Sequence, residues 1–179
     1  MLCEKDFPMK RYGISVRLVE EDDAEFILKL RTNRKLSRYL HKTDADIEKQ
    51  IQWIRNYKKR ELEGTEYYFL FYNDLQKIGV SRISDINDTN ASEGSWICDP
   101  SCNYEDIIAT SLFGSDIFFE VLELETNIFT VSKGNNSVLK YHRKRGSEVM
   151  KETDIEYTLR LDKQNYLKNR ERIIKLLNL

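Results

Sequence analysis

Cysteine, histidine and proline are scarce in this 179-residue sequence, which has three Cys, two His and two Pro. The cysteines are odd in number and form no paired Cys-x-x-Cys array, so the sequence predicts neither a disulfide framework nor a zinc site. The N-terminal residues Met-Leu-Cys-Glu-Lys-Asp are charged where a signal peptide needs an apolar core. We therefore expect a cytoplasmic protein that uses no metal.

Long apolar runs are also lacking, although 40% of the residues are hydrophobic and 33% are charged. This composition predicts one globular domain over residues 1–179 and no membrane partner. The formal net charge of -1 argues against a general nucleic-acid binder. The local basic clusters Lys58-Lys59-Arg60 and Arg143-Lys144-Arg145 fit a small anionic ligand better than nucleic acid.

Apolar periodicity predicts both strands and helices in the first half of the chain. Residues 14–19 alternate in character as a strand does, and the acidic run after them suits the first turn of a helix over residues 22–31. A broken helical piece is expected around residues 36–40. Thr43 and Asp46 form a weak capping box for a long helix that ends near Gly64. Residues 67–72 and 77–85 indicate an antiparallel hairpin, which the polar segment 87–93 closes.

The second half of the chain continues the mixed pattern of strands and helices. The expected elements are a strand at 95–98, a helix at 107–122, a strand at 128–131, a helix at 137–145, strands at 148–151 and 155–161, and a last helix capped by Asp162. The predicted order is therefore β, α, α, β, β, β, α, β, α, β, β, which is an α/β (α+β) arrangement with helices on both faces of one sheet.

The most informative stretch is the short strand and basic helix between Phe129 and Gly146. Alone, it fits equally well a strand, a turn and an amphipathic helix whose basic face is solvated. Its spacing, however, resembles the closing motif of the GCN5-related N-acetyltransferases (GNAT): an Asn, a small apolar residue three positions later, Tyr or His seven later and Gly eleven later. The matching residues are Asn135, Val138, His142 and Gly146.

This resemblance covers nearly the whole chain, because the order of the predicted elements is also that of the GNAT fold. It implies an open mixed, mostly antiparallel sheet of about seven strands that splays between the fourth strand, at 95–98, and the fifth, at 128–131. The segment Phe119 to Leu124 is similar to the end of the family's third helix and its link into the fifth strand. The implied activity is direct transfer of an acetyl or other short acyl group from acyl-CoA to an amine.

The sequence departs from the family at the start of the third helix. Members usually carry two glycines there, so that bare backbone amides approach the coenzyme A pyrophosphate, whereas residues 103–110 contain none. Glu105 and Asp106 even place negative charge there. Amides at a helix start and their dipole can still bind phosphate when side chains turn outward. The expected acyl-CoA contacts are Ile97, Cys98, Tyr104, Glu105, Asp106, Ile107, Ile108, Ala109, Thr110, Asn135, Lys140 and Arg143.

The resemblance also implies the roles of several polar residues. His142 occupies the position of the family's proton donor to the departing thiolate, and an imidazole with a pKa of about 6.5 can donate near neutral pH. Tyr141 is the neighbouring alternative, but adjacent helical residues point roughly 100° apart. Asp85 is the candidate general base, with Glu93 and His41 as alternatives. Cys98 has no histidine placed to activate it, so a covalent mechanism is not expected.

The acceptor is expected to contact the first half of the chain. The residues that border the acceptor side in this family are polar and aromatic here, which suits sugar and phosphate; the candidates are Arg31, Asn33, Tyr39, His41, Trp53 and Arg82. The pattern is similar to members that acylate nucleotide-linked amino deoxysugars. The ribosomal-protein alanine acetyltransferase branch and a non-catalytic ligand-binding or interaction module remain the alternatives. The resemblance also allows a homodimer.

Overall fold

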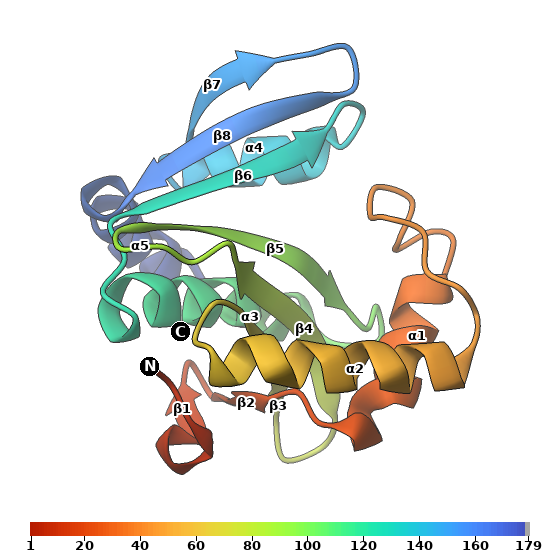
Figure 1. Ribbon diagram of the computed structural model, residues 1–179. Coiled ribbons are helices and arrows are strands. Elements are labelled where there is room, and N and C mark those ends of the chain that lie inside the picture. The colour runs from red at the N-terminus through yellow and green to blue at the C-terminus, as the bar shows by residue number, and fades with distance from the viewer. Residues whose placement is uncertain (178–179) are drawn as a thin grey trace.

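The computed structural model describes residues 1–177, which form an eight-stranded sheet with helices on both faces (Figure 1). The strand order is β1-β2-β3-β4-β5-β6-β8-β7. All neighbouring strands are antiparallel except β5 and β6, which are parallel. The strands are β1 (Met9–Arg11), β2 (Ile14–Leu18), β3 (Tyr67–Tyr72), β4 (Lys77–Ser84), β5 (Asn90–Cys98), β6 (Thr126–Ser132), β7 (Glu148–Glu152) and β8 (Glu156–Asp162).

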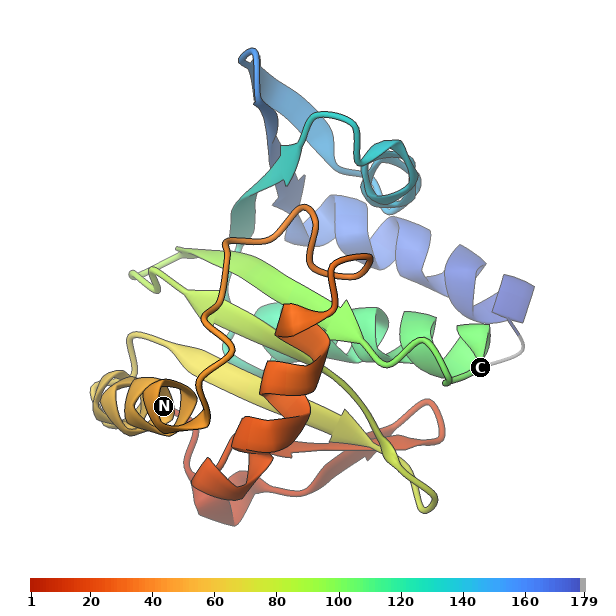
Figure 2. The ribbon, with the colours of Figure 1, turned by 90° about the vertical axis from the view of Figure 1, so that its right-hand side faces the viewer.

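Two helices cover one face of the sheet, and three cover the other. The helices are α1 (Ala24–Thr32), α2 (Ile47–Leu62), α3 (Tyr104–Asp116), α4 (Asn136–Lys144) and α5 (Lys163–Leu177), with 3-10 turns at Glu4–Asp6 and Glu21–Asp23 and a π-helical turn at Ile117–Val121. The α1 and α2 helices share one hydrophobic cluster with one face of the sheet, and α3 shares the other cluster. Figure 2 shows α1 on the side of the sheet opposite α3.

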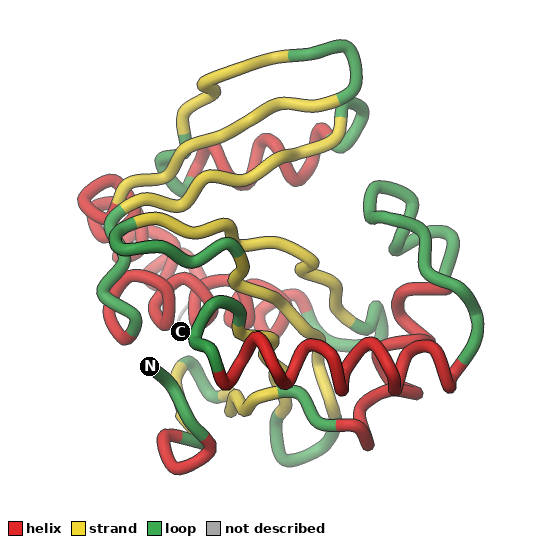
Figure 3. The backbone as a smooth tube through the Cα atoms, in the orientation of Figure 1, coloured by secondary structure: helices red, strands yellow, loops and turns green. Residues whose placement is uncertain are grey.

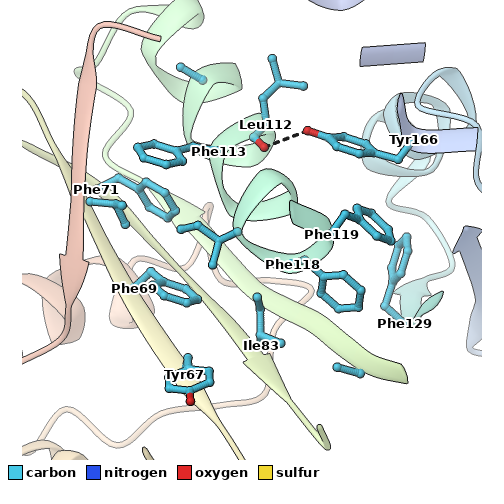
Figure 4. Packing of buried hydrophobic residues seen from close by; sticks show 14 of the residues in the cluster. Tyr67, Phe69, Phe71, Ile83, Leu112, Phe113, Phe118, Phe119, Phe129 and Tyr166 are labelled. Atoms are coloured by element: carbon cyan, nitrogen blue, oxygen red, sulfur yellow. Dashed lines mark hydrogen bonds between the residues drawn. The ribbon is translucent and has the colours of Figure 1, made fainter. Parts of the chain in front are cut away.

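Strand β3 lies inside the sheet and is covered by helices on both faces, which explains why its sequence is almost entirely aromatic and apolar. Successive strand residues point to opposite faces. Tyr67, Phe69 and Phe71 therefore face α3, whereas Tyr68 and Leu70 face α1 and α2. Figure 4 shows the α3 side of this core, where the Tyr166 hydroxyl from α5 donates to the Leu112 carbonyl at 3.0 Å.

The β5 and β6 strands remain paired over two residues only. Asn90 pairs with Thr126 and Ala91 with Asn127, after which the strands diverge (Figure 3). The buried Asn127 side chain contacts β5 nearby: its Oδ1 accepts from the Glu93 backbone N–H at 3.0 Å, and its Nδ2 donates to the Glu93 carboxylate at 3.1 Å. The predicted splay is confirmed.

Several expected boundaries differ from the observed ones. The sheet has one strand more than the seven expected, because the three-residue β1 is too short to show an alternating pattern. The polar segment before residue 95 is not a loop but the first part of β5, where ladder pairing with β4 outweighs low strand propensity. Residues 36–40 are turns rather than helix. Asp46, not Thr43, caps α2, and its carboxylate accepts from Glu48 N–H at 3.0 Å.

No helix among residues 1–177 is both long enough and apolar enough to cross a membrane.

The close contact between β4 and β5 at Gly79 generates a stability prediction. A Cβ at this position would lie 2.6 Å from both the Cys98 Sγ and the Ile97 carbonyl oxygen. Gly79→Ala should therefore lower the free energy of unfolding by about 1–3 kcal/mol, the usual cost of overpacking. Gly94→Ala is the matched control, because nothing lies within 4 Å of its added Cβ. Urea unfolding of both variants checks this, and equal stabilities would contradict it.

Candidate active site

Two cavities lie beside the C-terminal part of β5, residues 95–98. The first, the α2 cavity, has a volume of about 420 Å³, and the second, the α3 cavity, of about 350 Å³, both within the usual range of small-molecule sites. The α2 cavity is lined by Arg31, His41, Lys42, Thr43, Asp44, Lys49, Gln50, Trp53, Tyr68, Arg82 and Ser95. The α3 cavity is lined by Lys35, Leu36, Arg38, Tyr39, Leu40, Trp96, Ile97, Cys98, Pro100, Ile107, Asn135 and Val138.

A β-bulge in β5 separates the two cavities. Val80 pairs with Ile97 and Arg82 with Gly94, so Ser81 lies opposite both Ser95 and Trp96. Ser95 has a positive φ of 53°, which bends the strand. As a result, Ser95 lines the α2 cavity and the next residue, Trp96, lines the α3 cavity. Ligands in the two cavities would therefore approach each other at this bulge.

The α2 cavity is strongly cationic and contains an exposed aromatic side chain. Four basic side chains line it against one carboxylate: Arg31, Lys42, Lys49 and Arg82 against Asp44, which forms an ion pair with Lys49 at 2.6 Å. Trp53 is 36% exposed there, and its ring is held by stacking on Tyr57 with the centroids 6.0 Å apart. A polar anionic ligand with an apolar or aromatic part suits this lining.

Arg31 and Arg82 approach the α2 cavity from different elements. Arg31, on α1, donates to the Thr43 Oγ1 at 2.7 Å and to the His41 carbonyl at 3.2 Å, and so fixes the loop before α2. Arg82, on β4, forms a long contact of 3.4 Å with Glu66. Its buried Nε has no hydrogen-bond partner among the described residues. Since an unpaired buried donor is costly, Arg82 is well placed to bind an anionic or carbonyl group of a ligand.

The α3 cavity lies next to the start of α3. The Asn103 side chain caps this helix by accepting from the Asp106 N–H at 2.6 Å. The N–H groups of Tyr104 and Glu105 make no hydrogen bond within residues 1–177. Asp106 itself turns away and accepts from the Asn73 side chain at 3.0 Å. Two free amides and the helix dipole thus suit an anionic group in spite of the missing glycines.

Of the predicted contacts at the start of this helix, Tyr104, Glu105 and Asp106 do not line the cavity. The helix begins at Tyr104 rather than at Ile107 as predicted, because Asn103 provides an N-cap that the apolar periodicity does not reveal. Ile107 lines the cavity. The later residues Ile108, Ala109 and Thr110 are buried in the second turn, where their N–H groups belong to the helix. Thr110 instead accepts from the Trp96 indole N–H at 2.9 Å.

One loop forms walls of both cavities. This α1–α2 loop, residues 33–46, contributes His41 to Asp44 to the α2 cavity. Its contribution to the α3 cavity is Lys35, Leu36, Arg38, Tyr39 and Leu40. Tyr39 fixes its middle, because the Tyr39 hydroxyl donates to the Gly134 carbonyl at 2.7 Å. Figure 2 shows the loop rising from α1 toward the part of the molecule that contains β6 and α4. Tyr39, expected in the acceptor site, therefore lies in the α3 cavity instead.

The two candidate proton donors occupy different surroundings on α4. The His142 ring packs against Phe129 with the centroids 4.5 Å apart. Burial and, secondly, the nearby Arg145 guanidinium lower the pKa of His142 to about 3. The Tyr141 ring stacks on Trp96, 5.7 Å away, and burial raises the pKa of its hydroxyl. An imidazolium at His142 is thus disfavoured near neutral pH, whereas Tyr141 keeps its proton and lies directly behind the wall of the α3 cavity.

The carboxylates considered as general bases lie outside both cavities. Asp85 is exposed beyond the end of β4 and accepts from the Ser84 hydroxyl at 3.1 Å. Glu93 points toward α3, where Ser115 donates to it at 2.9 Å and burial raises the pKa of its carboxyl. Of the alternatives weighed from sequence, His41 is the one that lines the α2 cavity.

Three further predicted residues are placed away from the cavities. Asn33 caps the turn after α1, where its Oδ1 accepts from the Lys35 N–H at 3.0 Å. Lys140 and Arg143 are exposed on α4 and do not line the α3 cavity. Within residues 1–177, no cluster of His, Cys, Asp and Glu side chains could hold a metal ion.

The fold of the chain agrees with comparisons to known proteins. The sequence model of the acetyltransferase (GNAT) domain matches residues 14–148. The chain belongs to this family. A solved structure described as apo FdhC, a nucleotide-linked sugar GNAT, is 36% identical, with a TM-score of 0.84 over 96% of this chain and 98% of that chain. The family resemblance found from Asn135 to Gly146 is thereby confirmed, and the protein is an acyl-CoA-dependent GNAT acetyltransferase.

Two more distant structures share the fold. A spermidine N-acetyltransferase from Vibrio cholerae, in complex with CoA and spermine, is 17% identical, with a TM-score of 0.74 over 88% of this chain and 99% of that chain. The N-acetyltransferase PseH from Campylobacter jejuni is 22% identical, with a TM-score of 0.64 over 84% of this chain and 99% of that chain. No curated protein matches the sequence.

The buried position of His142 predicts an unusual pH response. At pH 5 its imidazole should remain neutral by NMR, although an unperturbed histidine, with a pKa of about 6.5, would be mostly charged. The folded state then binds fewer protons than the unfolded state below pH 6.5. Stability from this group is present above pH 6.5 and is lost as the pH falls toward 3.

His142→Phe removes this contribution, so its free energy of unfolding should fall less steeply than that of the wild type between pH 6.5 and 4. His41→Phe, at the exposed histidine, is the control. A His142 signal that titrates near pH 6.5 would contradict the prediction.

Proposed function

We propose that this GNAT enzyme acylates the amino group of a nucleotide-linked amino deoxysugar, with the nucleotide and sugar in the α2 cavity. The observation that carries the proposal is the charge of that cavity, four basic side chains against one carboxylate. A nucleotide-linked sugar carries a diphosphate, which such a cavity attracts. The 36% identity to a nucleotide-linked sugar GNAT supports the same substrate class.

The charge also weighs against other acceptors. A polyamine or a protein N-terminus is cationic before it reacts, and a cavity lined by Arg31, Lys42, Lys49 and Arg82 would repel it. A non-catalytic binding module would not need two cavities that meet at one bulged strand. The observations therefore favour a sugar nucleotide over the ribosomal-protein type of acceptor.

Acyl-CoA suits the α3 cavity, because Ile97 and Cys98 offer an extended strand for its pantetheine arm. The free amides of Tyr104 and Glu105, which lie at the start of α3 beside the cavity and not in its lining, suit its pyrophosphate. The acyl group, acetyl or another short chain, would lie near the bulge at Ser95 and Trp96. The amine would reach it from the α2 cavity, so that direct transfer needs no covalent enzyme intermediate. His41 is the lining residue that could accept the amine's proton.

Tyr141 is the proton donor that we propose for the departing thiolate. The nearby Arg145 guanidinium favours a phenolate but disfavours an imidazolium, so it makes proton loss from Tyr141 easier and charging of His142 harder. The ring of Tyr141 is held in place between Trp96 and Arg145, at 5.7 Å and 5.5 Å. A single transfer domain and a homodimer remain predictions from the sequence.

The proposed acceptor is tested by supplying the purified enzyme and acetyl-CoA with a panel of nucleotide-linked amino deoxysugars, an N-terminal ribosomal peptide and spermidine. Release of free CoA should occur with at least one amino sugar nucleotide and not with the other two amines. Activity on the peptide or spermidine alone would overturn the proposal.

Arg82→Gln should raise the KM for the sugar nucleotide about 10-fold or more, since a charge-assisted hydrogen bond is lost. The dissociation constant for CoA should not change, because Arg82 does not line the α3 cavity. Arg55→Gln is the matched control: this arginine lies on α2 but forms an exposed ion pair with Glu21 at 2.8 Å. Equal kinetics of the two variants would exclude Arg82 from the acceptor site.

Tyr141→Phe should lower kcat by about 10²- to 10⁴-fold, the usual contribution of general acid catalysis, with little change in CoA affinity. His142→Phe should change kcat by less than about 10-fold, since an uncharged imidazole is replaced by another ring against Phe129. Steady-state rates across pH 6 to 9 measure both. The opposite ranking of the two variants would return the donor role to His142.

A further inference from the structure

The charge that the α3 cavity offers to a phosphate comes from the α1–α2 loop. Its only charged lining residues, among residues 1–177, are Lys35 and Arg38. No carboxylate of the described chain shares the lining to neutralise them. The cavity therefore has a net positive charge. The two residues that carry it precede α3 by about 65 positions and belong to a segment expected from the sequence to lie on the acceptor side.

The cations on α4 do not provide this charge. Asn135 and Val138 line the cavity, and residues three apart share a helix face. Lys140 and Arg143 lie about 200° and 140° around the helix from Val138, at 100° per residue. Both are accordingly exposed.

A phosphate at the start of α3 needs a nearby cation more than a phosphate at a glycine-rich turn does. It offers the free N–H groups of Tyr104 and Glu105. The exposed Glu105 carboxylate, however, lies in the same turn and repels an anion. Because CoA carries several phosphate charges, a cation from another element would offset this repulsion.

The loop that carries the two cations is fixed at several points. Asn33 Oδ1 accepts from the N–H of Lys35 at 3.0 Å. The Arg38 guanidinium lies 4.5 Å from the centre of the Tyr39 ring, and Tyr39 in turn donates to Gly134 at 2.7 Å. The loop thus lies against the turn between β6 and α4, and this position places its two exposed cations in the lining of the α3 cavity.

We propose that Lys35 and Arg38 bind phosphate groups of acyl-CoA and replace part of the phosphate binding that the missing glycines provide in other members. The α1–α2 loop is then a part of the donor site as well as of the acceptor site. This assignment concerns acyl-CoA and is independent of which amine accepts the acyl group.

Titration calorimetry with CoA tests the assignment on Lys35→Gln, Arg38→Gln and the double variant. Each single change should weaken binding about 10- to 150-fold, the range of a lost charge-assisted hydrogen bond. Arg34→Gln is the matched control, since Arg34 is an exposed arginine of the same loop that does not line the cavity. It should bind CoA within about twofold of the wild type, as should Lys140→Gln and Arg143→Gln.

The salt dependence separates a lost charge from a disturbed loop. The difference between the wild type and the double variant should shrink as the ionic strength rises, because added salt screens exposed charges. The proposal is overturned if the double variant binds CoA within twofold of the wild type, or if its loss does not change with salt. It is also overturned if the α4 variants lose more affinity than the loop variants.

Discussion

The two-residue pairing between β5 and β6 is the constraint on which the site depends. A sheet that stayed paired beyond Ala91 and Asn127 would leave no room between the strands, and one without this pairing would separate β6, β8 and β7 from the rest. Asn127 occupies the branch point and bonds to both the backbone and the carboxylate of Glu93. One buried amide thus sets the place where the strands part, at a modest cost in lost strand pairing.

A buried arginine connects the helices behind this branch point. Arg145 is 1% exposed, lies between the rings of Tyr141 and Tyr166, and donates to the hydroxyls of Ser111 and Ser115. Ser115, which accepts from Arg145, donates in turn to the Glu93 carboxylate and so connects the two charges through one hydroxyl. The charge of Arg145 adds to the larger effect of burial in lowering the pKa of the neighbouring His142. Arg145 thus contributes both to the packing of α3, α4 and α5 and to the electrostatics of α4.

The fold could be predicted from the sequence, but only part of the candidate site could be. Strand β3 could be recognised over its full length, because an unbroken run of aromatic and apolar residues is typical of a strand buried on both faces. Arg31, Trp53 and Arg82 do come together at one cavity, since a helix or strand fixes the direction of a side chain once its face is known. Lys35 and Arg38 could not be found in this way, because a loop has no period, and the Tyr39 contact that orients it joins residues 95 apart.

The shared loop has a thermodynamic consequence for how the enzyme meets its two substrates. Any shift of residues 33–46 that accompanies filling of the α3 cavity also alters the wall of the α2 cavity, since both are built from this segment. Linkage then requires that each substrate change the affinity for the other by the same factor. Because contacts at Arg31, Tyr39 and Asp46 hold this segment together, a displacement at one wall is carried to the other, and a single segment couples the two substrates.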